Sequence, residues 1–261
     1  MQMPQLIAEQ IEYRELMFQM VARDLLLRYK QTAMGVAWAL LMPLLNTAIF
    51  SVVFMRVAPV HTPVPYPLFA FCGLLVWNYT ASALRFSVTS LTSNTSLVTK
   101  VYFPREIFPF AAVAVSFVDS AAAALVLAAM MIYYGVPLTR AVLLLPAVLA
   151  VHTAFTAALA LLLSMANLFY RDVKYIFDVV LTVWLFASAV VYPVDGIHGW
   201  AGWLIRANPM TAIVEAYRNV VLYGRAPDAV SFASVALVAA VLLPAAWLLF
   251  HRSEFQFAEN I

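Results

Sequence analysis

The stretch FPFAAVAVSFVDSAAAALVLAAMMIYY, residues 108–134, contains a single charged side chain, that of Asp119. The hydrocarbon core of a bilayer is about 30 Å thick, and a helix needs about 20 predominantly apolar residues to cross it. This stretch is long enough to do so. It therefore predicts a membrane-spanning helix.

The composition of the whole chain agrees with this prediction. Of 261 residues, 65% are hydrophobic and 11% are charged, and the mean hydropathy is +0.90, whereas roughly a quarter of the residues are charged in an ordinary soluble domain. The net charge of +2 is too small to indicate a nucleic-acid partner, and the single cysteine, Cys72, excludes a disulfide framework and a multi-cysteine metal site. We expect an all-α integral membrane protein.

Apolar runs of similar length lie on both sides of this stretch, at 36–57, 67–92, 141–166, 174–193 and 229–250. The chain is thus predicted to have six spans, and an even number places both termini on one side. The basic residues of that side are Arg14, Arg23, Arg28, Lys30, Lys100, Arg105, Arg171, Lys174 and Arg252; those of the opposite side are Arg56, Arg140, Arg206, Arg218 and Arg225. The positive-inside rule makes the first side cytoplasmic.

The predicted organisation is a cytoplasmic segment 1–35, a six-span domain 36–250 and a cytoplasmic tail 251–261. The first thirty residues have no short apolar core followed by a small-residue cleavage site, so no removable signal peptide is expected. Residues 6–30 predict an amphipathic helix that lies in the membrane interface. Its predicted apolar side carries Ile7, Ile11, Phe18, Val21 and Leu25. Such a helix is either a simple anchor or a contact for a cytoplasmic partner.

The last loop, 194–225, has the signals of a helix. Asn208 suits an N-cap, Pro209 suits the first helical position, and Gly224 suits the residue past the end. About fifteen residues reach only about 22 Å, too short to cross the bilayer. Together with GWAGWLIRA, residues 199–207, this segment predicts a re-entrant helical hairpin in the outer half of the membrane. A plain surface loop is the alternative.

Motifs for enzymatic chemistry are absent from the sequence. No glycine is followed by lysine, so there is no phosphate-binding loop, and Gly196, Gly199 and Gly202 do not fit G-x-G-x-x-G. The four histidines are scattered without the spacing of a metal site, and we expect structural or incidental roles for them: His61, His152, His198 and His251. Neither a metal nor a cofactor is expected on this chain.

Two ionisable residues lie inside predicted spans, Arg85 in the second and Asp119 in the third. Their similar depth on adjacent helices predicts a buried ion pair, because an unpaired charge at mid-membrane costs about 2.5 to 3.5 kcal/mol. A substrate or gating contact is the alternative role. Asp178 lies four residues after Lys174, a spacing that predicts a local pair.

The connection KVYFPREIFP, residues 100–109, places charged and aromatic side chains between Pro104 and Pro109. Mixed charge beside protruding aromatic rings is typical of a docking surface. The alternative is an interfacial turn, with its basic side chains at the headgroups and its rings at the lipid boundary.

Four segments carry a family resemblance: RDLLLRYKQTAMGVAWALLMPL at 23–44, KVYFPREIFP at 100–109, NLFYRDVKYI at 167–176 and NPMTAIVEAYRNVVLYG at 208–224. Together they resemble the permease subunit of bacterial ATP-binding-cassette exporters of polysaccharide. The resemblance implies a homodimer in the cytoplasmic (inner) membrane, with two copies of a separate ATPase that bind ATP and Mg²⁺. It also implies that a lipid-linked polymer passes between the permeases.

Roles for residues follow from the same resemblance. The loop 97–109 is the implied coupling element, the N-terminal helix docks on the ATPase, and the hairpin 194–225 gates the outer exit. The residues implied in ATPase coupling are Lys100, Tyr102, Phe103, Arg105, Glu106, Arg23, Arg28, Arg171 and Asp172. Those of the gate hairpin are Asn208, Pro209, Glu215 and Arg218.

The first and fifth spans face the dimer axis in the implied arrangement. Aromatic faces stack on sugar rings with little directional hydrogen bonding, so we expect Phe50, Phe54 and Trp184 to line a channel. Rings that face lipid are the alternative. The motifs favour an O-antigen-like substrate. Capsule, teichoic acid, a drug or a small lipid remain alternatives, and a secondary transporter or a membrane glycosyltransferase fits the dispersed acidic residues less well.

Overall fold

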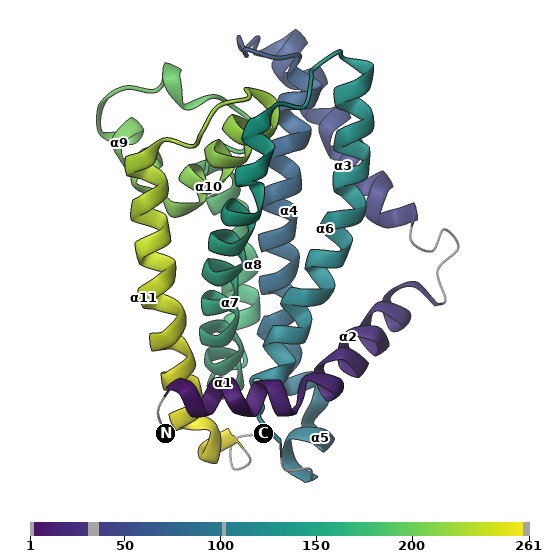
Figure 1. Ribbon diagram of the computed structural model, residues 1–261, viewed down its shortest axis with the longest axis vertical. Helices are drawn as coiled ribbons and strands as arrows, with labels where there is room; N and C mark the ends of the chain where they lie inside the picture. The colour runs from purple at the N-terminus through teal and green to yellow at the C-terminus, as the bar shows by residue number, and fades with distance from the viewer. Residues whose placement is uncertain (1–2, 31–36, 101–102, 258–261) are drawn as a thin grey trace.

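The computed structural model describes residues 3–30, 37–100 and 103–257. These residues form helices and connecting turns without a β-strand, which confirms the predicted all-α fold. The bundle is drawn in Figure 1. Its long helices are α3 (Ala37–Val52), α4 (Tyr66–Ser90), α6 (Ile107–Tyr133), α7 (Leu145–Phe169), α8 (Val173–Ala187) and α11 (Ala229–Ser253).

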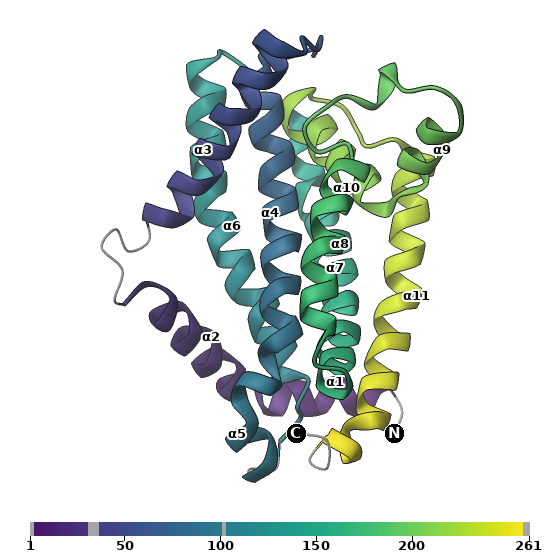
Figure 2. The same cartoon turned by 180° about the vertical axis from the view of Figure 1, so that it is seen from behind.

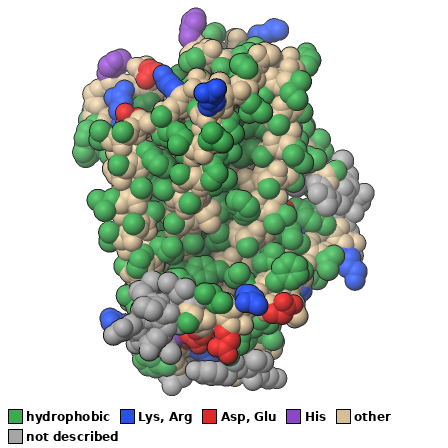
Figure 3. Space-filling view, in the orientation of Figure 1, with side chains coloured by type: hydrophobic (Ala, Val, Ile, Leu, Met, Phe, Trp, Pro, Cys, Tyr) green, Lys and Arg blue, Asp and Glu red, His purple; other side chains and the backbone are tan. Residues whose placement is uncertain are grey.

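Five helical segments among the described residues are long and apolar enough to cross a membrane: Leu40–Val57, Tyr66–Ser90, Ile107–Tyr133, Arg140–Phe169 and Ala229–Gln256. They correspond to five of the six predicted runs. On the face drawn in Figure 3, hydrophobic side chains cover the middle of the bundle, and the visible Lys, Arg, Asp and Glu side chains gather toward its two ends. This distribution fits a protein whose flank faces lipid.

The remaining predicted run, 174–193, which is the fifth in chain order, is helical only as far as Ala187. Ala189 has a φ of 49°, in the left-handed region that interrupts a right-handed helix. The prediction of a helical span is therefore wrong from residue 188 onward, and α8 has only 15 residues. Helix α8 nevertheless runs along the bundle beside α7 (Figures 1 and 2).

Helix α4 is the centre of the bundle. In the most hydrophobic 18-residue stretch of α4, 83% is buried inside the bundle. Helix α4 contacts α3, α6, α7, α8 and α10. The corresponding buried share is 11% for α3 and 17% for α11. The core is thus built around α4, while α3 presents an apolar surface that the described part of the chain leaves largely uncovered.

The predicted helix over 6–30 consists of two helices, α1 (Met3–Glu12) and α2 (Arg14–Tyr29), that meet at Tyr13. Figure 1 shows α1 crossing the lower end of the bundle, where both termini lie, and α2 slanting away from it.

The side chains of the predicted apolar side have different surroundings, and none of these tests the predicted place of the segment in the membrane interface. The side chains that pack on the bundle are Tyr13, Leu16, Met17, Met20 and Val21. Ile11 and Phe18 are exposed, Leu25 is half-buried, and the side chain of Ile7 lies outside the described ones. The Tyr13 N–H donates to the Glu9 carbonyl at 3.0 Å and the Met17 N–H donates to the Tyr13 carbonyl at 3.1 Å, so hydrogen bonds connect the two helices across the break.

The helical hairpin before the last span is confirmed, and the plain-loop alternative is wrong. Helix α9 (Gly199–Ala207) leads into α10 (Pro209–Tyr217), which continues as a π-helical turn, Arg218–Leu222. The Asn208 side chain accepts a hydrogen bond of 3.0 Å from the Met210 N–H, which confirms the N-cap. Most of α10 is buried against α4, α7 and α11, with α9 further out (Figure 2).

Candidate functional site

The turn between α5 (Thr95–Lys100) and α6 lies at the lower end of the bundle. The carbonyl of Pro104 accepts from the Ile107 N–H at 3.3 Å, and that of Arg105 accepts from the Phe108 N–H at 3.2 Å. These bonds begin α6 directly after the turn. Phe103 and Phe108 are buried, with ring centroids 5.5 Å apart. The expectation of protruding rings is therefore wrong for both, while Tyr102 and the side chain of Lys100 lie outside the described part of the chain.

The remaining predicted coupling residues of this turn bind the end of α11. Arg105 donates its backbone N–H to Glu254 Oε1 at 3.0 Å, and its guanidinium donates to the Glu254 carbonyl. Glu106 is fully buried, and its Oε1 lies 3.0 Å from His251 Nδ1. No local pattern predicts these contacts, because they join residues about 150 positions apart.

Three acids converge at this junction. His251 Nδ1 also lies 3.4 Å from Glu254 Oε2, and on α1 the pKa of Glu9 is raised by burial and by the nearby charge of Glu106. Glu106, His251 and Glu254 each place one donor atom within 4.8 Å of the others, a spacing that suits a metal ion. The Arg105 guanidinium supplies counter-charge to Glu254, and a hydrogen bond between His251 Nδ1 and Glu106 Oε1 accounts for their approach, so the geometry does not require a metal.

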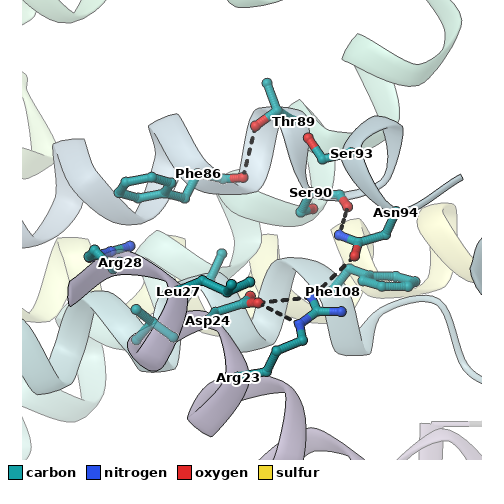
Figure 4. Close-up of a pocket in the computed structure, with 12 residues that line it drawn as sticks. Arg23, Asp24, Leu27, Arg28, Phe86, Thr89, Ser90, Ser93, Asn94 and Phe108 are labelled. Carbon is teal, nitrogen blue, oxygen red and sulfur yellow. Dashed lines mark hydrogen bonds and ion pairs between the residues drawn. The ribbon is translucent and has the colours of Figure 1, made fainter. Parts of the chain in front are cut away.

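A cleft of about 470 Å³ separates α2 from α4 at the same end. Figure 4 shows Arg23 between Asp24 on its own helix and Asn94, which follows α4. Arg23 Nε lies 2.9 Å from Asp24 Oδ1, and its Nη2 lies 3.1 Å from Asn94 Oδ1. Arg23 thus ties the N-terminal segment to the connection that leads into α5.

The predicted pair of Arg85 with Asp119 is wrong, because both residues have other partners. Asp119 forms an ion pair with Arg28, and its Oδ1 accepts from the Tyr29 hydroxyl at 2.6 Å. Burial and this bond to Asp119 raise the pKa of Tyr29 to about 12. Arg85 Nε lies 3.0 Å from Asp178 Oδ1 on α8. Arg85 and Asp119 lie at similar positions along their helices, but the rotation of each helix points the two side chains toward different neighbours.

Two further expectations change as a consequence. Arg28, expected to face the ATPase, points to Asp119 and lies 3.9 Å from the centroid of the Phe86 ring. The local pair of Lys174 with Asp178 is also wrong, because Asp178 pairs with Arg85 and the Lys174 ammonium lies 4.7 Å from the Tyr175 ring centroid.

Arg171 and Asp172 are exposed in the turn between α7 and α8. The backbone carbonyl of Asp172 accepts from the N–H groups of Tyr175 and Ile176, which begins α8. Arg171 borders a polar groove of about 500 Å³ whose other walls are Thr89, Thr92, Ser93, Thr95, Asn167 and Lys174. The lower end therefore offers an open polar groove beside the buried turn.

The predicted channel aromatics are half-buried and contact other rings of this chain. Phe50 and Phe54 are stacked at 6.3 Å, and Phe54 lies 5.7 Å from Tyr66. Trp184 meets Trp77 edge to face at 5.6 Å and donates its Nε1–H to Asn208 Oδ1 at 3.2 Å. A channel role for these side chains stays a prediction.

Arg218, predicted to lie in the gate hairpin, is fully buried at the end of α8. Its guanidinium donates to the carbonyls of Ala189 at 3.0 Å and Val190 at 2.5 Å, and to Glu215 Oε1 at 2.8 Å. It also lies 3.5 Å from the centroid of the Phe69 ring. These bonds hold the turn that ends α8, which explains why the helix stops at Ala187.

Gly73 on α4 makes room for that arrangement. A Cβ atom at this position would lie 2.2 Å from the Val190 carbonyl oxygen and 2.7 Å from Arg218 Nη2. Only a residue without a side chain lets the backbone of the turn approach so closely. The sequence reading missed Gly73, because a glycine inside a span has several possible roles.

The comparisons with known proteins cover nearly the whole chain. Residues 15–222 match the family described as ABC-2 type transporter. An O-antigen export system permease protein RfbA of Myxococcus xanthus is 30% identical over 99% of this chain and 100% of its own length. Two O-antigen export system permease proteins RfbA of Klebsiella pneumoniae are each 26% identical over 91% of both chains. The chain belongs to the ABC-2 type transporter family of membrane proteins.

Proposed function

We propose that this chain is the permease half of an ATP-driven exporter that moves a lipid-linked, O-antigen-like polysaccharide across the cytoplasmic membrane. The observation that carries the proposal is the full-length similarity, 30% identity over 99% of the chain, to a protein named for O-antigen export. That name favours O-antigen over capsule, teichoic acid, a drug or a small lipid. ATP and Mg²⁺ bind to a separate ATPase subunit, with which this chain assembles.

A second copy of this chain completes the transporter. Apolar side chains at least half exposed lie on α3, on the turn after it and on α8: Ile49, Val52, Met55, Val179, Val183 and Phe186. A helix whose apolar side chains lack protein neighbours is covered either by lipid or by another subunit. We assign these two helices to the homodimer contact, with the polymer passing between the two copies.

The ATPase binds at the lower end, which is the cytoplasmic end in this proposal. Helix α5 projects from the bundle there (Figure 2), and the polar groove beside Arg171 opens at the same end. We infer that α5 and the rim of this groove contact the ATPase. Phe103, Arg105 and Glu106 act behind that surface as the anchor of the coupling turn, since their side chains face inward.

The export path and its outer exit follow from the same arrangement. Phe50, Phe54 and Trp184 offer aromatic faces to sugar rings as the polymer passes. The hairpin of α9 and α10 gates the outer exit, with Asn208 bonded to Trp184 and to the Ala187 carbonyl. A movement of the Trp184 side chain would therefore be passed to the hairpin through its hydrogen bond to Asn208.

The proposal is tested in a bacterium that assembles the polymer but lacks its own export permease. This chain and its ATPase are supplied, and polymer at the cell surface is measured with antibody on intact cells. We expect surface polymer with the active ATPase and none with an ATPase variant that binds but does not hydrolyse ATP. Polymer that stays inside the cells in both cases, with both subunits in the membrane, would overturn the proposal.

A further inference from the structure

We propose that the C-terminal end of α11 is part of the coupling element. Arg105 and Glu106 of the coupling turn, with His251 and Glu254 of the C-terminal segment, form what we name the C-terminal clamp. The clamp makes the start of α6 and the end of α11 move as one body when the ATPase moves the turn. This inference rests on the proposed function, since it assigns positioning residues for ATP-driven export.

The polar contacts of the clamp hold the turn from two sides. Glu254 Oε1 accepts a hydrogen bond of 3.0 Å from the backbone N–H of Arg105 and lies 3.9 Å from Arg105 Nε. The Arg105 guanidinium donates to the backbone carbonyl of Glu254. The side chains of Arg105 and Glu254 are 16% and 19% exposed. Backbone and side chain of each residue are thus engaged together, and charge-assisted bonds shielded from water are the strong ones.

Glu106 makes the clamp costly to open. Its side chain is fully buried, Oε1 lies 3.0 Å from His251 Nδ1, and Oε2 has no hydrogen-bond partner among the described residues. A buried carboxylate separated from its partner keeps the desolvation penalty of its charge. The acids that face His251 are Glu106 and Glu254, with Glu9 of α1 nearby. Removal of His251 would take away the hydrogen-bond partner of the buried Glu106 Oε1.

Aromatic packing joins the same segments. Phe250 and Phe257 are fully buried, with ring centroids 5.0 Å apart, and both belong to one cluster with Phe103, Phe108 and Met20. Helix α11 also packs along α7 over much of its length. Close-packed side chains and hydrogen-bond networks carry motion between distant sites. A displacement of the turn is thereby passed to α6, α11 and α7 together.

The clamp is tested in proteoliposomes that hold the complete transporter, with ATP hydrolysis and polymer transport measured on the same sample. Glu254→Gln removes the charge while keeping side-chain volume and an acceptor oxygen, and Arg252→Gln on the exposed side of the same helical turn is the matched control. We expect Glu254→Gln to assemble and hydrolyse ATP, with transport per ATP lower by about fivefold, because its bonds to Arg105 lose the assistance of the carboxylate charge. The control should match the unaltered complex.

A comparison of variants distinguishes a loss of coupling between ATP hydrolysis and transport from a loss of protein stability. Arg105→Lys keeps the positive charge and a donor toward the Glu254 carbonyl, whereas Arg105→Gln removes the charge, and we expect Arg105→Lys to retain more transport per ATP than Arg105→Gln. Normal transport per ATP in Glu254→Gln, or equal losses of transport and hydrolysis, would overturn the clamp. Failure of the unaltered complex to move polymer would instead contradict the proposed function.

A distance measurement keeps the proposal falsifiable even where the variants fail to assemble. Val118 on α6 and Phe255 after α11 are both exposed, and spin labels at these positions report the separation of the two helices by pulsed electron paramagnetic resonance. Cys72 is buried, so it should not take up label. We expect the same separation without nucleotide and with bound ATP. A separation that changes on ATP binding would show that the clamp opens.

Discussion

Helical phase determines which ionisable side chains of the predicted spans pair with one another. Asp119 faces α2, where Arg28 and Tyr29 bind it, and Arg85 faces Asp178 on α8. The presence of charges within the spans was readable from the sequence, as was their depth. Their pairing was not, because the direction of α2 and the rotation of α4 depend on packing that a single helix does not encode.

Double-mutant cycles should separate the two pairings. Arg28→Leu and Asp119→Leu should show a coupling free energy of about 0.5–3 kcal/mol when combined, because they remove one partly buried pair. Arg85→Leu with Asp119→Leu should be additive within about 0.5 kcal/mol. The measurement is thermal unfolding of the purified protein. Coupling of Asp119 to Arg85 and not to Arg28 would contradict the observed pairing.

At the scale of elements, the apolar runs predicted α4, α6, α7 and α11 well, since each is bounded by charged residues, Pro or Gly. Helix α8 was predicted too long because its end is held by Arg218, about thirty residues later in the chain. The N-terminal helix was predicted as one piece because no Gly or Pro marks the break at Tyr13. The hairpin was readable because Asn208, Pro209 and Gly224 are local signals.

Substitution of Gly73 should loosen the contact between α4 and the end of α8. Gly73→Ala would place its Cβ 2.2 Å from the Val190 carbonyl oxygen, so we expect a loss of about 1–3 kcal/mol in the free energy of unfolding, typical of overpacking. Gly196→Ala is the matched control, because no atom lies within 4 Å of its added Cβ. The midpoint of thermal unfolding is measured for both. Equal midpoints would show that the turn can move away without cost.

For the whole molecule, the uncovered faces of α3 and α8 predict contacts between two copies. Single cysteines at Ile49 or Val183 should form cross-links between chains in membranes treated with a short bifunctional thiol reagent. A cysteine at Leu125, which is exposed on α6, is the control and should stay uncross-linked. Cross-links at Leu125 alone would place the dimer contact on another face of the bundle.

In the proposed function, ATP hydrolysis by a partner ATPase drives polysaccharide through a pair of these chains. The most direct measurement is transport of the lipid-linked polymer in proteoliposomes that contain only this chain and its ATPase, with the polymer added on the ATPase side and detected on the other. We predict that polymer crosses with ATP and does not cross with a non-hydrolysable analogue. Transport at the same rate without ATP hydrolysis, or none at all from a complex that hydrolyses ATP, would contradict the account.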